Sequence, residues 1–294
     1  MRALLGKVLR LSAGLALAMP TLGCAPARLL NALITEDGYR VERDIAYADA
    51  PRQRLDIYVP DAVTPGAKVA IFFYGGRWEY GSKVDYRFVG QALASRGIIT
   101  VIADYRLYPD VRFPGFVEDG AKAVGWVRRY IAERGGDPES IYLVGHSAGA
   151  HIAAMLALNP RFLAAEGVRV LDLGGLIGLA GPYEFLPIKD PVIKEIFAVD
   201  NLEATQPITY ASRQAPSTLL LTGDVDETVL PRNSARLGEA ISHAGGGAEV
   251  KVYQRIGHIG ILLALASPVR WLAPTLDDIV AFIRSAPRSN RRAA

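Results

Sequence analysis

From Tyr39 onward, short runs of β-forming residues alternate with longer amphipathic runs. This alternation is typical of a mostly parallel β-sheet that is covered by helices on both faces. Residues 69–73 form an unbroken apolar run bounded by Gly66 and Gly75, which suits a central strand buried on both sides. The sequence therefore predicts an α/β fold with eight strands, near residues 41–47, 53–59, 68–74, 99–104, 141–145, 175–180, 217–222 and 249–254.

One helix and one long connection stand out between the predicted strands. Apolar residues recur at spacings of three and four over residues 117–134, and two glycines follow, so we expect a helix there. Residues 182–216 are too long for an ordinary connection between strands and are a candidate lid of small helices over one end of the sheet. No internal repeat or change of composition marks a second domain, and we expect one domain over residues 39–285.

Charge and cysteine content exclude several classes of protein. The chain has 33 basic and 30 acidic residues, and its one short basic stretch, from Arg284 to Arg292, overlaps the expected tail at residues 286–294. No basic block of the kind that grips a phosphate backbone is present, so nucleic acid is not an expected partner. The single cysteine can form neither an internal disulfide nor a cysteine-rich metal site, and no metal is expected.

Residues 1–23 resemble an export signal. Basic residues lead an apolar stretch over residues 11–19, which is shorter than the roughly 20 residues that span a bilayer. Cys24 follows Thr-Leu-Gly and resembles the cleavage box of bacterial lipoproteins, where the cysteine is lipidated and becomes the new N-terminus. The alternative is a free cysteine beside an ordinary cleavage site at residues 25–27. Both interpretations predict an exported protein of a bacterium, either periplasmic or anchored to a membrane through Cys24, with residues 24–38 as a tether.

Residues 145–149 read Gly-His-Ser-Ala-Gly, between a compact apolar strand and a stretch that favours a helix over residues 148–158. In this strand-turn-helix context, the glycines on either side of Ser147 let the chain turn so sharply that the hydroxyl stands exposed at the edge of the sheet. We therefore interpret Ser147 as a nucleophile rather than as a structural serine in a glycine turn.

A serine nucleophile needs a base, and a neutral imidazole suits neutral pH. Among the four histidines, His258 follows the last predicted strand on a loop that can return to the edge of the sheet near Ser147. His146, His151 and His243 are expected to be structural or solvent-facing, with the side chain of His146 pointing away around the turn.

The imidazole in turn needs a carboxylate that fixes its tautomer. Three acids follow the strand predicted at residues 217–222, namely Asp224, Asp226 and Glu227. We favour Asp226 and expect the other two to lie on a solvated turn. The chain order is then serine, acid, histidine.

A tetrahedral intermediate places negative charge on the former carbonyl oxygen, which requires nearby hydrogen-bond donors. The strand predicted at residues 68–74 is followed by Gly-Gly-Arg-Trp. We expect the backbone N–H groups of Gly76 and Arg77, together with that of Ala148, to form this oxyanion hole. The alternative is a plain glycine turn.

Together these stretches resemble the α/β-hydrolases of the esterase and lipase group, close to the carboxylesterases with an H-G-G-x-W loop. The resemblance spans residues 40–284 and rests on residues 75–78, 104–107, 135–138, 145–149 and 257–258. In this family the acid stands three residues after a glycine and three before a valine, which Asp226 matches. The family usually has histidine where this chain has Tyr74.

The resemblance implies an α/β-hydrolase fold and a serine hydrolase that cleaves carboxylic esters of small molecules through an acyl-enzyme on Ser147, without a cofactor. It extends to plant isoprenylcysteine methylesterases and to kynurenine formamidase-like enzymes, so amides remain alternative substrates. The alternative from another class is a binding protein that keeps the fold without catalysis.

Overall fold

The computed structural model describes residues 31, 34–35 and 37–285. The predicted export signal, Cys24 and the basic tail at residues 286–294 lie outside these residues. Within the described part of the chain, no helix is both long and apolar enough to cross a membrane.

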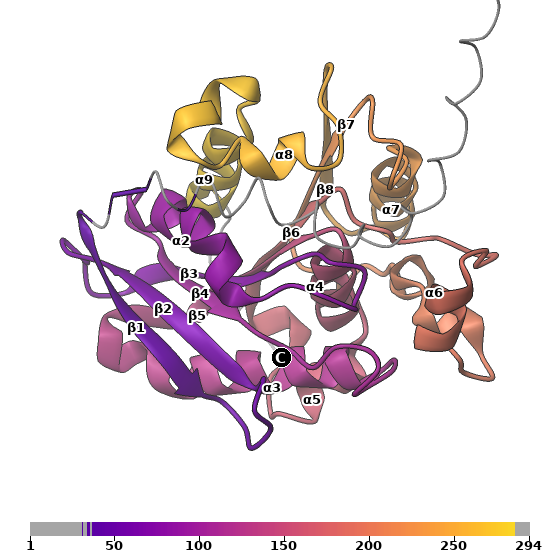
Figure 1. Cartoon of the computed structure of the whole chain (residues 1–294), viewed down its shortest axis with the longest axis horizontal. Coiled ribbons are helices and arrows are strands. Elements are labelled where there is room, and N and C mark those ends of the chain that lie inside the picture. Colours follow the sequence, from indigo (N-terminus) through magenta and orange to yellow (C-terminus); the bar gives the residue numbers. More distant parts are fainter. Residues whose placement is uncertain (1–30, 32–33, 36, 286–294) are drawn as a thin grey trace, which may run out of the picture.

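All eight predicted strands are present, and they form one sheet (Figure 1). The spatial order is β1, β2, β4, β3, β5, β6, β7, β8, with β1 and β2 antiparallel to their neighbours and every other pair parallel. The strands are β1 (Tyr39–Ala46), β2 (Arg54–Pro60), β3 (Ala67–Phe73), β4 (Ile99–Ala103), β5 (Gly136–His146), β6 (Leu173–Leu179), β7 (Thr218–Gly223) and β8 (Ala248–Tyr253).

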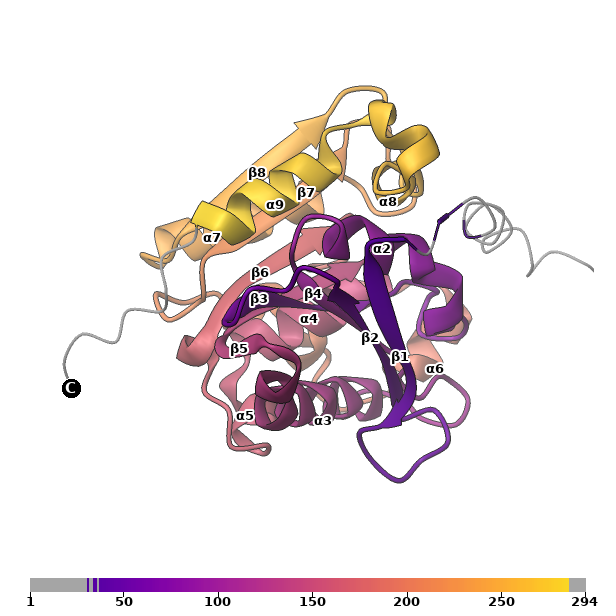
Figure 2. The ribbon, with the colours of Figure 1, turned by 90° about the vertical axis from the view of Figure 1, so that its left-hand side faces the viewer.

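Helices cover both faces of the sheet, as the alternating pattern predicts (Figure 2). The α-helices are α2 (Arg87–Ala94), α3 (Gly115–Tyr130), α4 (Ala148–Leu158), α5 (Pro160–Ala164), α6 (Pro191–Ile196), α7 (Arg232–His243), α8 (Gly260–Leu263) and α9 (Thr275–Ser285). The 3-10 helices are η1 (Lys83–Tyr86), η2 (Ile131–Arg134), η3 (Val170–Asp172), η4 (Leu202–Thr205), η5 (Pro207–Tyr210) and η6 (Ser267–Leu272). Helices α3 and α4 pack on one face, and α2 and α9 pack together on the other.

The apolar run at residues 69–73 is completely buried in the middle of the sheet, between β4 and β5. The predicted helix at residues 117–134 is α3 followed by η2, and Gly135 ends it in the left-handed conformation at a φ of 84°. Strand β5 begins at Gly136, earlier than predicted. Its first residues form a bulge, because the side chain of Asp137 accepts hydrogen bonds from the Glu139 N–H and the Ser140 hydroxyl.

A buried carboxylate joins the end of β4 to α3. Asp119 is fully buried and accepts hydrogen bonds from the Gln53 side chain at 2.6 Å and from the Arg106 backbone N–H at 2.9 Å. The Arg106 guanidinium adds a contact at 2.7 Å. This network anchors the loop that leads from β4 toward α3.

Replacement of Asp119 should destabilise the fold. In Asp119→Ala, the Gln53 amide, the Arg106 backbone N–H and the Arg106 guanidinium lose their acceptor, so we expect urea unfolding to give a free energy of unfolding lower by about 2–4 kcal/mol. Glu118→Ala removes the exposed neighbouring carboxylate and should change it by less than about 0.5 kcal/mol. Equal effects of the two substitutions would contradict this role for Asp119.

Candidate active site

Ser147 lies in a sharp turn between β5 and α4, with a φ of 53° and a ψ of −123°. Only glycine fits at the two flanking positions, Gly145 and Gly149, because neighbouring backbone leaves no room for a Cβ atom. A Cβ at Gly145 would lie 2.3 Å from the Gly149 carbonyl oxygen, and a Cβ at Gly149 would lie 2.0 Å from the Phe73 carbonyl oxygen. The turn therefore exposes the hydroxyl of a half-buried Ser147 at the carboxyl edge of the sheet.

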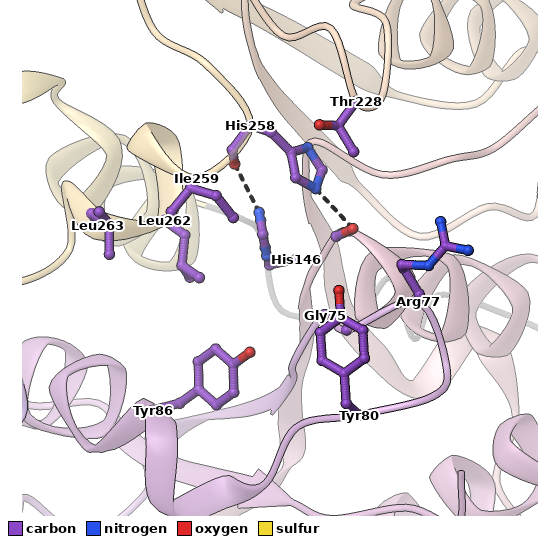
Figure 3. Close-up of a pocket in the computed structure, with 12 residues that line it drawn as sticks. Gly75, Arg77, Tyr80, Tyr86, His146, Thr228, His258, Ile259, Leu262 and Leu263 are labelled. Carbon is purple, nitrogen blue, oxygen red and sulfur yellow. Dashed lines mark hydrogen bonds between the residues drawn. The ribbon is translucent and has the colours of Figure 1, made fainter. Parts of the chain in front are cut away.

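The structure brings Ser147, His258 and Asp226 together in one hydrogen-bonded chain (Figure 3). His258 Nδ1 is 2.8 Å from Asp226 Oδ2, and His258 Nε2 is 2.9 Å from Ser147 Oγ. Since an ionised carboxylate only accepts hydrogen bonds, Nδ1 carries the proton and Nε2 is left as the acceptor for the serine hydroxyl.

The Asp226 side chain is fully buried and is held by the turn after β7. Its Oδ1 accepts hydrogen bonds from the backbone N–H groups of Thr228 and Val229, both at 2.9 Å. Asp224 and Glu227 are exposed, and Asp224 instead accepts a hydrogen bond from the Arg255 N–H at 2.6 Å. Among the three acids of this turn, only Asp226 reaches His258.

His146 differs from the expectation that its side chain points away from the site. It is buried, it lines the same cavity as His258, and its Nε2 donates to the His258 carbonyl oxygen at 2.9 Å (Figure 3). Burial lowers the pKa of His146 to about 3, so its ring stays neutral. The difference arises because the loop after β8 folds back over the end of β5, a contact between residues far apart in sequence.

The side chains of His151 and His243 form no hydrogen bond with Ser147. His151 is fully buried in α4, where its Nε2 donates to the Thr205 carbonyl oxygen at 2.8 Å and its ring packs edge-on against Trp78. Burial lowers the pKa of His151 to about 4. His243 is exposed at the end of α7.

The loop after β3 lies directly against the serine. A Cβ at Gly75 would be 2.9 Å from Ser147 Cβ. Gly76 and Arg77 have φ values of 125° and 55°, and both line a cavity together with Ser147. Ala148 is the first residue of α4, so its backbone N–H has no acceptor within that helix. The three predicted oxyanion-hole residues thus surround the serine.

Tyr74 anchors the base of this loop through its hydroxyl. The Tyr74 hydroxyl donates to Asp104 Oδ1 at 2.7 Å and accepts from the Arg52 guanidinium at 2.8 Å. Its ring stacks on Tyr86 and Tyr105 at 5.1 Å and 4.8 Å. Burial raises the pKa of Tyr74 well above its ordinary value, so the phenol remains a neutral donor. Sequence spacing gives no signal for these contacts.

Two cavities meet at Ser147. The first, here the histidine-side cavity, has a volume of about 230 Å³ and borders His258; its apolar wall consists of Tyr80, Tyr86, Ile259, Leu262 and Leu263 (Figure 3). The second, the lid-side cavity, has a volume of about 210 Å³ and lies between Trp78 and a group of residues from the candidate lid that includes Phe185, Ile188 and Ile193. The candidate lid contains the small helices α6, η4 and η5, and an ion pair of 2.9 Å joins its Asp190 to Arg77.

Among the described residues, no cluster of three or more histidine, cysteine, aspartate or glutamate side chains could hold a metal ion.

Comparison with known protein families finds one matching family model, described as BD-FAE, over residues 55–241. The isoprenylcysteine alpha-carbonyl methylesterase of Arabidopsis thaliana is 31% identical over 269 residues, which cover 84% of this chain. The esterase LipQ of Mycobacterium tuberculosis is 29% identical and covers 82% of this chain. The chain spans 62% of the length of each of these two relatives.

Solved structures give the same picture of the architecture. A truncated form of a carbohydrate esterase from gut microbiota superimposes with a TM-score of 0.73 at 19% identity, covering 86% of this chain and 98% of its own. A butyrate-bound thermophilic esterase of Thermogutta terrifontis superimposes with a TM-score of 0.71 at 23% identity, covering 87% of this chain and 97% of its own. At these identities the likeness shows a shared fold.

The buried His151 should make stability fall in acid. Its unfolded pKa is near 6.5 and its folded pKa is about 4, so only the unfolded state takes up the proton between these pH values. Its contribution to stability is therefore complete above pH 6.5 and is lost as the pH falls toward 4. His151→Gln keeps a side-chain donor but does not titrate. The free energy of unfolding, measured with urea, should therefore fall by about 2 kcal/mol less between pH 7 and pH 5 in His151→Gln than in the parent. An unchanged pH dependence would contradict the assignment.

Proposed function

Because the chain belongs to the BD-FAE family and has the α/β-hydrolase fold that its sequence predicts, we propose that it is a serine hydrolase that cleaves carboxylic esters through an acyl-enzyme on Ser147. The observation that carries this proposal is the hydrogen-bonded chain from Asp226 through His258 to Ser147, at 2.8 Å and 2.9 Å. The named activities of its relatives, methylesterase and esterase, support it.

In the proposed mechanism, His258 Nε2 takes the proton of the Ser147 hydroxyl as Oγ attacks the ester carbonyl carbon. The oxyanion that forms is stabilised by the backbone N–H groups of Gly76, Arg77 and Ala148. Asp226 holds the imidazole in the required tautomer and stabilises the imidazolium.

The intermediate then collapses, the bond between the carbonyl carbon and the alcohol oxygen breaks, and His258 gives its proton to the leaving alcohol. A water molecule, deprotonated by His258, attacks the acyl-enzyme, and the carboxylic acid leaves as Ser147 regains its proton. Since the leaving alcohol must lie beside His258, we assign it to the histidine-side cavity and the acyl group to the lid-side cavity. Both walls are mainly apolar, which favours small esters with apolar groups on each side.

Removal of the nucleophile tests the activity itself. Ser147→Ala should lower kcat/KM for p-nitrophenyl butyrate by at least about 10⁴-fold, because no covalent intermediate can form. The circular dichroism and thermal unfolding of the variant should match those of the parent. Residual hydrolysis near the parent rate would contradict the mechanism.

A matched pair of substitutions tests the choice of acid. Asp226→Asn should lower kcat by about 10²- to 10⁴-fold, because the amide no longer enforces the tautomer in which His258 Nε2 accepts a proton. Asp224→Asn makes the same change two residues away on an exposed side chain, and its kcat should stay within about twofold of the parent value. If Asp224→Asn were the damaging change, the acid would be reassigned.

We also propose that the protein is exported and attached to a membrane by a lipid on Cys24. Support comes from the basic leader, the apolar stretch at residues 11–19 and the small residue before Cys24. The basic residues that end the chain offer an alternative, electrostatic route to a membrane surface, and salt distinguishes the two.

Lipid attachment predicts that salt does not release the enzyme from membranes. Apolar burial of acyl chains is only weakly screened, so esterase activity should remain in the membrane fraction after a wash with 1 M salt, a condition in which charge attraction is screened within about 3 Å. Cys24→Ser should release active enzyme. A mature chain that begins at Arg28, shown by mass spectrometry, would replace lipid attachment with simple secretion.

A further inference from the structure

The rim of the histidine-side cavity is apolar and exposed to solvent. Tyr80 and Ile259 face each other across the cavity and are 37% and 38% exposed (Figure 3). Val84, in η1, is 54% exposed and stands two residues before the cavity residue Tyr86. Tyr80 and Ile259 are therefore large apolar side chains exposed at the cavity that borders His258, and Val84 is exposed on the 3-10 helix that supplies Tyr86 to its wall. Exposed apolar residues gathered at a pocket mouth mark an interaction surface.

The chain that leads to Cys24 is attached to this rim. The Asn31 side-chain amide donates to the Val84 carbonyl oxygen at 2.9 Å, and its oxygen accepts from the Phe88 N–H at 3.1 Å. Cys24 precedes Asn31 by seven residues. Even a fully extended chain of that length spans at most about 25 Å. A lipid on Cys24 would thus hold this rim close to the membrane surface, whatever path the intervening residues take.

A tryptophan in the segment after α8 adds to the exposed apolar surface on this part of the molecule. Helix α8 supplies Leu262 and Leu263 to the cavity wall, and η6 packs against α8. Trp271, in η6, is 80% exposed. Tryptophan favours the boundary between water and lipid, because its ring is apolar while its N–H can bond to water or headgroups.

We propose that the rim formed by Tyr80, Val84 and Ile259 docks on the lipid surface to which Cys24 attaches the chain, so that the histidine-side cavity opens toward the bilayer. The inference rests on the proposed ester hydrolysis and lipid attachment. The substrate would then come from the membrane. It would be an ester whose apolar alcohol portion is dissolved in the bilayer and enters the cavity without crossing water. The tether favours a lipid surface over a protein partner as the occupant, because it brings the rim and the lipid together in every molecule.

A matched pair of aspartate substitutions tests the docking. Val84→Asp places a charge on the rim, at a residue outside the cavity wall. Leu171→Asp places the same charge on an equally exposed apolar residue, 55% exposed, in η3 before β6. Leu171 lies at the amino edge of the sheet, opposite the edge that carries Ser147. Trp271→Ala is a second variant of the proposed face.

Each full-length, lipidated protein is reconstituted in vesicles of phosphatidylethanolamine and phosphatidylglycerol. One assay follows a fluorogenic ester with a long alkyl alcohol embedded in the same vesicles, and the other follows p-nitrophenyl butyrate in water. Val84→Asp should lower the rate on the embedded ester by at least about fivefold, and Trp271→Ala should lower it in the same direction. The rate of Leu171→Asp on the embedded ester should stay within about twofold of the parent rate. On p-nitrophenyl butyrate, the rates of all three variants should stay within about twofold of the parent rate.

Equal rates for Val84→Asp and Leu171→Asp on the embedded ester would overturn the docking while leaving ester hydrolysis intact, because the soluble assay measures hydrolysis separately. A parent protein inactive on both esters would overturn the proposed function, and an unlipidated Cys24 in the mature protein would overturn the docking.

A bimane probe measures the docking separately. The emission of a bimane on Val84→Cys should shift to shorter wavelength on the vesicles, and that of a bimane on Leu171→Cys should not. An unshifted probe at residue 84, together with a dimer that Val84→Asp dissociates, would assign the rim to a second copy of the chain instead.

Discussion

The close approach of α4 to the end of β3 is the constraint on which the whole site depends. The α4 backbone at Gly149 comes so near the Phe73 carbonyl oxygen that no side chain fits between them. This contact holds Ser147 at a positive φ, which costs an ordinary residue about 1–2 kcal/mol. The same contact sets the loop after β3 against the serine. One backbone approach thus positions both the hydroxyl and the loop of Gly75, Gly76 and Arg77 beside it.

Much of this arrangement was predictable because the parallel sheet places the carboxyl ends of its strands at one edge. The short runs of β-forming residues predict all eight strands, and the unbroken apolar run at residues 69–73 predicts the buried central one. Ser147, Asp226 and His258 each follow a strand, so their meeting follows from topology once the strands are known. The early start of β5 was missed, because local hydrogen bonds to Asp137, rather than apolar residues, shape its first turn.

Contacts made between distant loops were not predictable. The bond from His146 to the His258 carbonyl joins residues 112 positions apart, and it depends on how the loop after β8 folds back. The contacts of Tyr74 with Arg52 and Asp104 are of the same kind. The Tyr74 contacts explain how the loop after β3 is held, although this chain lacks the histidine that the similar carboxylesterases usually have at position 74. A phenol that donates to a buried carboxylate and stacks between two further tyrosines anchors the loop, and these contacts use none of the backbone N–H groups of Gly76 and Arg77.

Ester hydrolysis at this site depends on the activation of Ser147 by His258, and covalent labelling measures that activation at the serine itself. A fluorophosphonate probe reacts with a serine whose hydroxyl is activated by a neighbouring base and forms a stable adduct there. Peptide mass spectrometry of the labelled protein should place one adduct on Ser147, and folded His258→Ala should label at least about 10³-fold more slowly. If the folded parent stayed unlabelled at Ser147, or if His258→Ala labelled at the parent rate, His258 would not activate Ser147, and the arrangement would be that of a binding protein with a hydrolase fold.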